Sequence, residues 1–356
     1  MIVKERVSLT HRAVALFSGG LDSTLSILAV LRQNVKVTAL KFITPFDQDM
    51  TAMSPFIEEP HALAEKFGFD VETLEIPGQF LKIVKKPKFG YGKNMNPCID
   101  CRILMLKAAK DFMKKIEADF IISGEVLGQR PMSQRKNVLY LIDKEAGVEG
   151  YVLRPLSAKL LKPTIPESEM IINRDVLYDF RGRSRKPQMT LAKEFGLTKY
   201  PAPAGGCLLT EPNYAHRLKE LLTYNLGPGL DDLLLLKIGR HFRLSPSCKI
   251  IVGRNKSEND QLWSLSARGL ILKIETCGSP TVLVTGEITE EAVRVGASLC
   301  VRYSDAKNLS EVEVTAIKEG CICKLRATPC SDEIIETLRI ELKSSIHREY
   351  LETIRL

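Results

Sequence analysis

The sequence contains no continuous apolar run of about 18 residues, so it offers no segment that could cross a membrane as a helix. Its first residues lack the apolar core and the cleavage site of a secretory signal peptide, and we expect the chain to remain in the cytoplasm. Low-complexity tracts and internal repeats are also missing. The 356 residues, 44% hydrophobic and 26% charged, have the composition of a globular protein and the length of two or three domains.

Charge and cysteine content restrict the function classes further. The net charge of +8 is compatible with a polyanionic partner, and equally with a basic surface that only keeps the protein in solution. Nine cysteines are an odd number in a long chain without an export signal. This pattern argues against a disulfide framework and favours metal binding or catalysis for the cysteines that cluster.

The first half of the chain alternates short apolar strands with helices. The pattern predicts strands over 13–17, 35–43, 71–76 and 120–123, and helices over 23–32, 61–67 and 101–116. Strand–helix–strand units of this kind build a parallel sheet. We therefore predict an α/β fold with a doubly wound parallel sheet.

The later part of the chain has a different texture. Residues 181–187 are basic and rich in turn formers, and residues 200–207 contain two prolines and two glycines. From about residue 236, short β-rich runs surround one helix at 289–303, which predicts a smaller α+β domain. We assign the domains as follows: first domain 1–180, linker and Cys207 loop region 181–234, second domain 235–325, and a charged helical tail 326–356.

A glycine-rich turn, Ser18 to Ser23 (SGGLDS), ends the first strand. Such a turn points backbone N–H groups outward, and the dipole of the following helix adds positive charge, so together they form an anion site. The turn matches neither the Walker spacing nor the dinucleotide fingerprint. Asp22 would act through a Mg²⁺ ion or cap the helix. A plain strand–turn–helix connection remains the alternative.

A second polar stretch, residues 123–134 (SGEVLGQRPMSQ), follows another predicted strand. Glu125, Gln129 and Gln134 supply polar groups at a strand end, which is where open α/β sheets bind ligands. A solvated loop is the alternative reading.

Three cysteines stand in segments where chemistry is plausible. Cys98 and Cys101 form a C-x-x-C at a predicted helix start, a position that lowers thiol pKa values and suits a metal, a cluster or a redox dithiol. Cys207 follows a Gly-Gly turn in an irregular segment. Two incidental thiols and an ordinary loop cysteine are the alternatives.

The SGGLDS turn resembles the signature of the PP-loop ATP pyrophosphatase family. With GEVLGQ, VLRPL, NPCIDC and the later Gly-Cys, roughly residues 12–225 resemble tRNA thiouridine synthetases of the ThiI and MnmA types. The resemblance implies cleavage of ATP between its α and β phosphates and adenylation of a carbonyl oxygen that later leaves as AMP. It implies these ATP-binding residues: Ser18, Gly19, Gly20, Asp22, Ser23, Lys41, Gly124, Glu125 and Gln129.

The resemblance also gives the cysteines roles. In the MnmA type, Cys98 and Cys207 occupy the places of the two active cysteines, so with Asp22 they are the implied catalytic residues. In cluster-dependent relatives, Cys98, Cys101 and Cys207 would hold a [4Fe–4S] cluster with one open iron. Cys101 favours the cluster, and a persulfide relay through two cysteines is the alternative. The pair Cys321 and Cys323 is weak evidence for zinc.

The later domain, roughly residues 235–320, resembles the NFACT-R RNA-binding domain through its GRN segment at 253–255 and YSDAKN at 303–308. Basic side chains there and in the 181–186 run could contact RNA phosphates. The predicted RNA-binding residues are Arg181, Arg183, Arg185, Lys186, Arg254, Asn255 and Lys307. A hairpin turn and a solvated linker are the alternatives.

Taken together, these features predict an ATP-dependent tRNA sulfurtransferase that uses ATP, Mg²⁺ and a [4Fe–4S] cluster. Its expected partners are tRNA and a sulfur donor, either sulfide or a cysteine desulfurase, with no membrane, and a homodimer is left open. A cluster-free persulfide-relay thiolase, a PP-loop ligase or sulfur insertase acting on a small molecule, and a non-catalytic RNA-binding adaptor are the alternatives.

Overall fold

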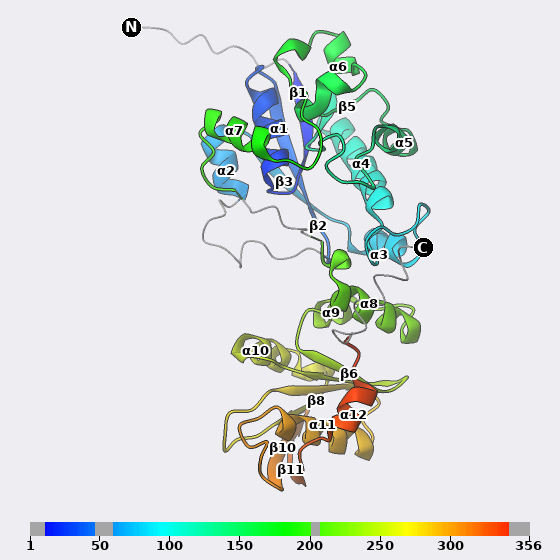
Figure 1. Ribbon diagram of the computed structural model, residues 1–356, viewed down its shortest axis with the longest axis vertical. Helices are drawn as coiled ribbons and strands as arrows, with labels where there is room; N and C mark the ends of the chain where they lie inside the picture. Colours follow the sequence, from blue (N-terminus) through cyan, green and yellow to red (C-terminus); the bar gives the residue numbers. More distant parts are fainter. Residues whose placement is uncertain (1–10, 47–59, 201–206, 342–356) are drawn as a thin grey trace. The chain divides into compact units, whose positions relative to one another are not determined.

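The computed structural model describes residues 11–46, 60–200 and 207–341 (Figure 1). The chain divides into two compact units, residues 1–208 and residues 209–356. None of the described helices is long and apolar enough to span a bilayer.

The first unit is built on a five-stranded parallel sheet in the order β3-β2-β1-β4-β5. The strands are β1 (Arg12–Phe17), β2 (Lys36–Ile43), β3 (Asp70–Glu75), β4 (Phe120–Ser123) and β5 (Val152–Leu153). The strand order reverses at β1, which lies between β2 and β4. Open α/β sheets bind ligands beside the carboxyl ends of the strands at such a switch point. The predicted doubly wound parallel sheet is confirmed.

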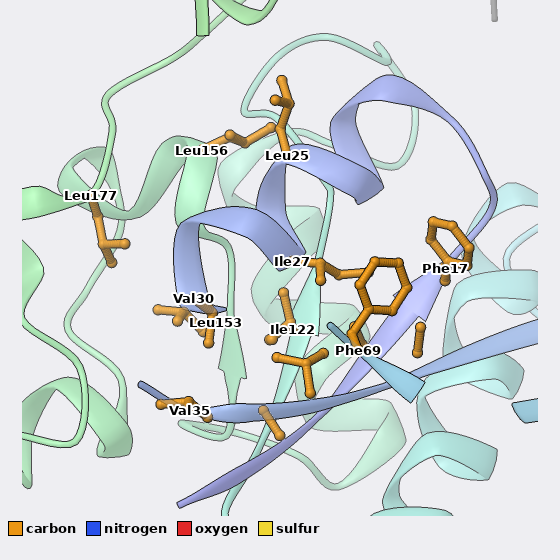
Figure 2. Packing of buried hydrophobic residues seen from close by; sticks show 14 of the residues in the cluster. Phe17, Leu25, Ile27, Val30, Val35, Phe69, Ile122, Leu153, Leu156 and Leu177 are labelled. Atoms are coloured by element: carbon orange, nitrogen blue, oxygen red, sulfur yellow. The ribbon is translucent and has the colours of Figure 1, made fainter. Parts of the chain in front are cut away.

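Helices cover both faces of this sheet because successive side chains of β1 point to opposite sides. Ala13, Ala15 and Phe17 pack with residues of α1 (Leu21–Leu31), α2 (Pro60–Phe67) and α7 (Lys186–Glu194). Val14 and Leu16 pack with residues of α4 (Cys98–Lys115) and α5 (Lys136–Ala146). Figure 2 shows part of the first cluster, where the rings of Phe17 and Phe69 meet edge to face with centroids 5.8 Å apart.

Shorter elements complete the first unit. They are α3 (Pro77–Lys85), η1 (Pro155–Leu160), α6 (Ile165–Ser168) and η2 (Arg174–Val176). The helix expected over 101–116 begins three residues earlier, at Cys98. The carboxylate of Asp100 accepts hydrogen bonds from the backbone N–H groups of Lys88 (2.8 Å) and Phe89 (3.1 Å), which fixes this helix start to the preceding loop. Both cysteines of the C-x-x-C therefore lie on the first turn of α4.

The second unit contains a six-stranded antiparallel sheet in the order β11-β10-β8-β9-β7-β6. Its strands are β6 (Arg240–Ser245), β7 (Cys248–Val252), β8 (Gly269–Lys273), β9 (Val282–Gly286), β10 (Val312–Lys318) and β11 (Cys321–Ala327). Ile250 and Val252 face α11 (Glu290–Arg302) and α12 (Asp332–Leu338), whereas Ile251 faces α9 (Leu230–Leu235) and α10 (Lys256–Ser264). This is the smaller α+β domain that the sequence predicts.

The segment between the two sheets is largely helical. Residues 181–234 contain α7 in the first unit and α8 (Pro212–Tyr224) and α9 in the second, with η3 (Leu208–Thr210) between them. The irregular stretch expected over 200–207 lies mostly outside the described residues, as does the part of the predicted tail after residue 341. The described part of that tail forms the short helix α12 and its flanks.

Candidate functional site

The turn between β1 and α1 has the geometry of an anion cradle. Gly19 has φ +72°, a left-handed conformation that favours glycine. The hydroxyl of Ser23 donates to the carbonyl oxygen of Gly20 at 2.9 Å, and the hydroxyls of Ser18 and Ser23 lie 3.2 Å apart. Gly20 is the N-cap of α1 and has no side chain to cap it, so the first turn keeps N–H groups for a ligand.

The residue after β4 lies directly against this turn. A Cβ atom on Gly124 would come 2.7 Å from both the backbone N and the Cα of Ser23, and 2.9 Å from the backbone carbonyl carbon of Asp22. These are backbone atoms that cannot rotate away, so only glycine allows the approach. The structure thus brings the SGGLDS turn and the SGEVLGQ stretch together at the switch point of the sheet.

Asp22 is the carboxylate of this site. Its Oδ2 accepts a hydrogen bond from Nε2 of Gln129 at 2.9 Å, while its buried Oδ1 has no partner among the described residues. Burial raises the pKa of Asp22, although Gln129, Arg185 and Arg130 act in the opposite direction. A buried carboxylate oxygen without a partner fits an oxygen-seeking cation such as Mg²⁺, which would also hold the carboxylate ionised.

Glu125, two residues after β4, is buried in the first unit. It is 2% exposed, and its Oε2 accepts hydrogen bonds from Ser123 and from Nε of Arg154, both at 3.1 Å. Arg154 also holds both carboxylate oxygens of Asp143, at 2.7 and 2.8 Å. Burial alone would raise the pKa of Glu125, but the charges of Arg154 and Arg102 outweigh it and the pKa is lowered. Glu125 is therefore held in a buried ion-pair network with Arg154 and Arg102.

The two cysteines of α4 are half-buried. The Sγ of Cys101 lies 3.9 Å from the Sδ of Met105. Burial raises the pKa of Cys98 above its ordinary value of 9.0, against the opposing charges of Arg130 and Arg102. For Cys98, burial therefore acts against the lowered pKa expected at a helix start, and it outweighs the charges of Arg130 and Arg102.

All nine cysteines lie within the described residues, and none forms a disulfide. Across the described ranges, no three His, Cys, Asp or Glu side chains come together as a group that could hold a metal ion. Cys98, Cys101 and Cys207 therefore do not form the three-thiolate set of a cluster in this arrangement. The residues present do not fit a [4Fe–4S] cluster, nor do Cys321 and Cys323 form a zinc site.

The remaining predicted nucleotide residue, Lys41, lies on β2, where its Cα is the register partner of Phe17 at the end of β1. Two side chains that the sequence analysis did not include also lie at this site. Arg102 of α4 approaches Glu125, with Nε 3.6 Å from Oε1, and Gln188 of α7 is fully buried beside Asp22. Arg102 follows Cys98 by one helical turn, a spacing that sequence reading could have used, whereas nothing local marks Gln188.

The predicted RNA-binding residues fall into two groups. Arg181 pairs with Leu127 in a β-bridge, which places the 181–186 run beside the loop that carries Gln129. In the second unit, the guanidinium of Arg254 is ion-paired with Glu258, and the side chain of Asn255 accepts a hydrogen bond from the Glu258 N–H as the N-cap of α10. Lys307 is exposed. Arg254 and Asn255 thus have structural roles, whatever else they contact.

The fold and the site define a PP-loop-like nucleotide domain joined to a second, antiparallel domain, and two family models match these parts separately. Residues 9–165 match the model described as thiamine biosynthesis protein (ThiI), and residues 239–339 match the model of the NFACT protein RNA-binding domain. The chain is therefore similar to PP-loop tRNA thiouridine synthetases in its first unit and to an RNA-binding domain in its second, which confirms the resemblance inferred from the motifs.

Curated relatives include tRNA-specific 2-thiouridylases MnmA. The one from Pseudomonas fluorescens (strain Pf0-1) is 24% identical over 226 residues, which cover 61% of this chain and 57% of the relative. The one from Shewanella pealeana is 22% identical over 291 residues, covering 77% and 74%. The chain thus spans little more than half the length of the first of these relatives.

Two solved structures are also similar. One is a 4-thiouridine synthetase–RNA complex with bound ATP, at 18% identity and a TM-score of 0.34, covering 64% of this chain and 52% of the other. The other is the C-terminal part of a fibronectin/fibrinogen-binding protein from Streptococcus suis, at 18% identity and a TM-score of 0.25, covering 43% and 77%.

Proposed function

We propose that this protein is an ATP-dependent tRNA uridine sulfurtransferase. The observation that carries the proposal is the SGGLDS turn at the switch point of the sheet, locked to the end of β4 by Gly124 and followed by a helix without a side-chain cap. The match of the first unit to ThiI and of the second to an RNA-binding domain supports RNA as the acceptor. The proposed enzyme binds both ATP and tRNA with one chain.

The activation step uses the turn and Asp22. The N–H groups of the turn and of the first turn of α1 bind the phosphates of ATP. Asp22 Oδ1 would hold a Mg²⁺ ion, which neutralises phosphate charge when bound. A uridine carbonyl oxygen attacks the α-phosphorus, the bond to the β-phosphate oxygen breaks, and pyrophosphate leaves. The product is a uridine with AMP on its carbonyl oxygen.

The sulfur step is proposed in its persulfide form, because the described residues do not fit a cluster. Cys207 carries a persulfide whose outer sulfur comes, already at that oxidation level, from a persulfide donor such as a cysteine desulfurase, and an external thiol reduces the disulfide that remains after each turnover. Its terminal sulfur attacks the activated carbon, and AMP leaves with the former carbonyl oxygen. Cys98 then attacks the Cys207 sulfur, forming a disulfide and releasing thiouridine.

The test is thiouridine formation in tRNA, measured by mass spectrometry of digested nucleosides after reaction with ATP and a persulfide donor. We expect the wild-type chain to form thiouridine and Cys98→Ala, Cys207→Ala and Asp22→Asn to form none. Cys323→Ser, which changes an exposed thiol in the second unit, is the matched control and should keep full activity. Wild-type activity in Cys98→Ala would refute the assignment of the cysteines.

Cys101 separates the two sulfur mechanisms. A persulfide relay needs only Cys98 and Cys207, so Cys101→Ser should retain most of the activity. Loss of activity in Cys101→Ser with folding intact, together with iron and acid-labile sulfide in anaerobically purified protein, would replace the relay with a cluster.

A further inference from the structure

The basic run 181–186 is anchored against the nucleotide site by its backbone. The Gly182 N–H donates to the carbonyl oxygen of Leu127 at 2.8 Å, next to the Arg181–Leu127 bridge. From the other side, the Ser157 hydroxyl donates to the carbonyl oxygen of Phe180 at 2.6 Å and accepts from the Leu127 N–H at 2.9 Å. The run therefore has a fixed place beside the loop that carries Gln129.

The helix that follows this run brings a buried amide to Asp22. Gln188, on the first turn of α7, is fully buried and close enough to Asp22 to lower its pKa, yet neither its amide nitrogen nor its amide oxygen reaches full hydrogen-bond geometry with a partner among the described residues. Asp22 Oδ1 and Gln129 Oε1 are also buried without partners. Buried polar groups in native proteins are nearly always satisfied, so this concentration of unsatisfied atoms at one turn indicates a ligand-binding site.

Two arginines flank this site from different segments. Arg185 is the N-cap of α7, three residues before Gln188, and Arg130 directly follows Gln129, whose Nε2 donates to Asp22 at 2.9 Å. The positive charges of both arginines also act to lower the pKa of Asp22. Neither guanidinium forms an ion pair or a hydrogen bond with any other described residue. They are therefore available for an anion at the mouth of the turn.

We propose that Arg185 and Arg130 bind the β- and γ-phosphates of ATP and hold the pyrophosphate as it leaves. The inference rests on the proposed function for its nucleotide and names the side chains that grip the leaving group. The turn and the N-terminus of α1 supply neutral N–H donors, whereas two guanidiniums supply the full positive charge and the bidentate geometry that a pyrophosphate requires. Arg185 of the basic run would then bind the nucleotide, in addition to any contact that the run makes with RNA.

The experiment is equilibrium binding to the full chain without tRNA, using ATP, inorganic pyrophosphate and AMP as separate probes that compete with a fluorescent ATP analogue. Arg185→Ala and Arg130→Ala should each weaken ATP and pyrophosphate roughly 10-fold or more, the loss expected for a charge-assisted hydrogen bond. AMP affinity should change less than about 2-fold, because AMP lacks the β- and γ-phosphates. Arg183→Ala is the matched control, with the same charge removed from an exposed position in the same run.

Three results would overturn the inference: unchanged ATP and pyrophosphate binding in Arg185→Ala, an equal loss of AMP, or weaker tRNA binding in Arg183→Ala and Arg185→Ala alike with ATP binding intact. The last result would make the run an RNA contact. Failure of the proposed function is distinguishable, because it would appear as normal ATP and pyrophosphate binding without tRNA-dependent thiolation.

Discussion

At the scale of single residues, Cys98 shows how burial and charge compete at a reactive thiol. The side chain is half-buried at the first turn of α4, and desolvation disfavours the thiolate. Arg130 and Arg102 favour the thiolate but do not compensate fully. Arg130 acts on Asp22 as well, so one guanidinium lies within electrostatic range of both the nucleotide turn and the thiol.

The alkylation rate of Cys98 and its dependence on pH should reflect this balance between burial and charge. In the protein without ligands, its reaction with iodoacetamide should be slower at pH 7 than that of an ordinary exposed thiol, and its rate should rise until the pH exceeds 9.0. Arg102→Ala should move the rate profile to still higher pH. The measurement is mass spectrometry of peptide 98–102 over a pH series, with exposed Cys323 as the internal reference. A profile for Cys98 centred below that of Cys323 would contradict the account.

Gly124 is the residue-scale test of the site geometry. Gly124→Ala should lower the free energy of unfolding by about 1–3 kcal/mol and remove ATP binding, because the new methyl group meets the backbone of Asp22 and Ser23. Gly78→Ala is the control, since its Cβ would meet nothing within 4 Å and α3 should gain up to about 1 kcal/mol. Urea unfolding and ATP titration check both variants; normal ATP binding in Gly124→Ala would be inconsistent with the packing described.

At the scale of elements, the parts of the site that sequence reading could predict are those with local signals. The run AVALF followed by two glycines predicts β1 and its turn, and Ser123 to Gln129 follows a visible strand. Gln188 has no such signal, because its neighbour in space, Asp22, is 166 positions away and only the packing of α7 on α1 brings them together. β11 has a weak sequence signal because it lies at the edge of its sheet, where positions such as Ile322 are exposed and show no buried alternation.

The buried ion pairs of Arg154 join α5 to the segments that follow β4 and β5. Arg154→Leu leaves the buried carboxylates of Glu125 and Asp143 without their cation, and we expect a loss of about 3–5 kcal/mol at pH 7. The exposed Lys88–Glu145 pair is the control, and Lys88→Ala should leave the free energy of unfolding nearly unchanged, because water screens the pair.

The pH dependence of this loss has a definite sign. Because the folded-state pKa of Glu125 is below 4.5, its pairing stabilises the native state above pH 4.5 and is lost as the pH falls through the folded value. The deficit of Arg154→Leu should therefore shrink in acid. Chemical unfolding of the wild type and Arg154→Leu at pH 7 and pH 3.5 measures this loss of stability. An equal loss at both pH values would show that the ionised Glu125 carboxylate is not its cause.

At the scale of the whole molecule, the unfolding of the second unit can be followed by itself. The only tryptophan, Trp263, lies on α10 and reports on the second unit. His241 in that unit is fully buried, with Nε2 2.8 Å from the carbonyl oxygen of Ile238. Burial, together with the charges of Lys249 and Arg217, lowers its pKa well below 6.5, so the folded second unit keeps this histidine neutral.

The stability of the second unit should fall in mild acid. Below pH 6.5 the unfolded chain binds a proton at position 241 that the folded unit does not, so the free energy of unfolding should drop by up to about 1.4 kcal/mol per pH unit. Denaturant unfolding followed by Trp263 fluorescence at pH 7.5 and 5.5 measures this drop. His241→Gln should reduce it, and an identical pH dependence in the variant would assign the effect to other groups.

The most direct test of the central claim follows the oxygen that leaves with AMP. The chain is incubated with tRNA, ATP and a persulfide donor in ¹⁸O-labelled water, and AMP and thiouridine are quantified by mass spectrometry. If a uridine carbonyl is adenylated, AMP forms only with tRNA, equals thiouridine in amount and carries no label from water. AMP that forms without tRNA, or that carries ¹⁸O, would show that water attacks the α-phosphorus and would contradict the proposed function.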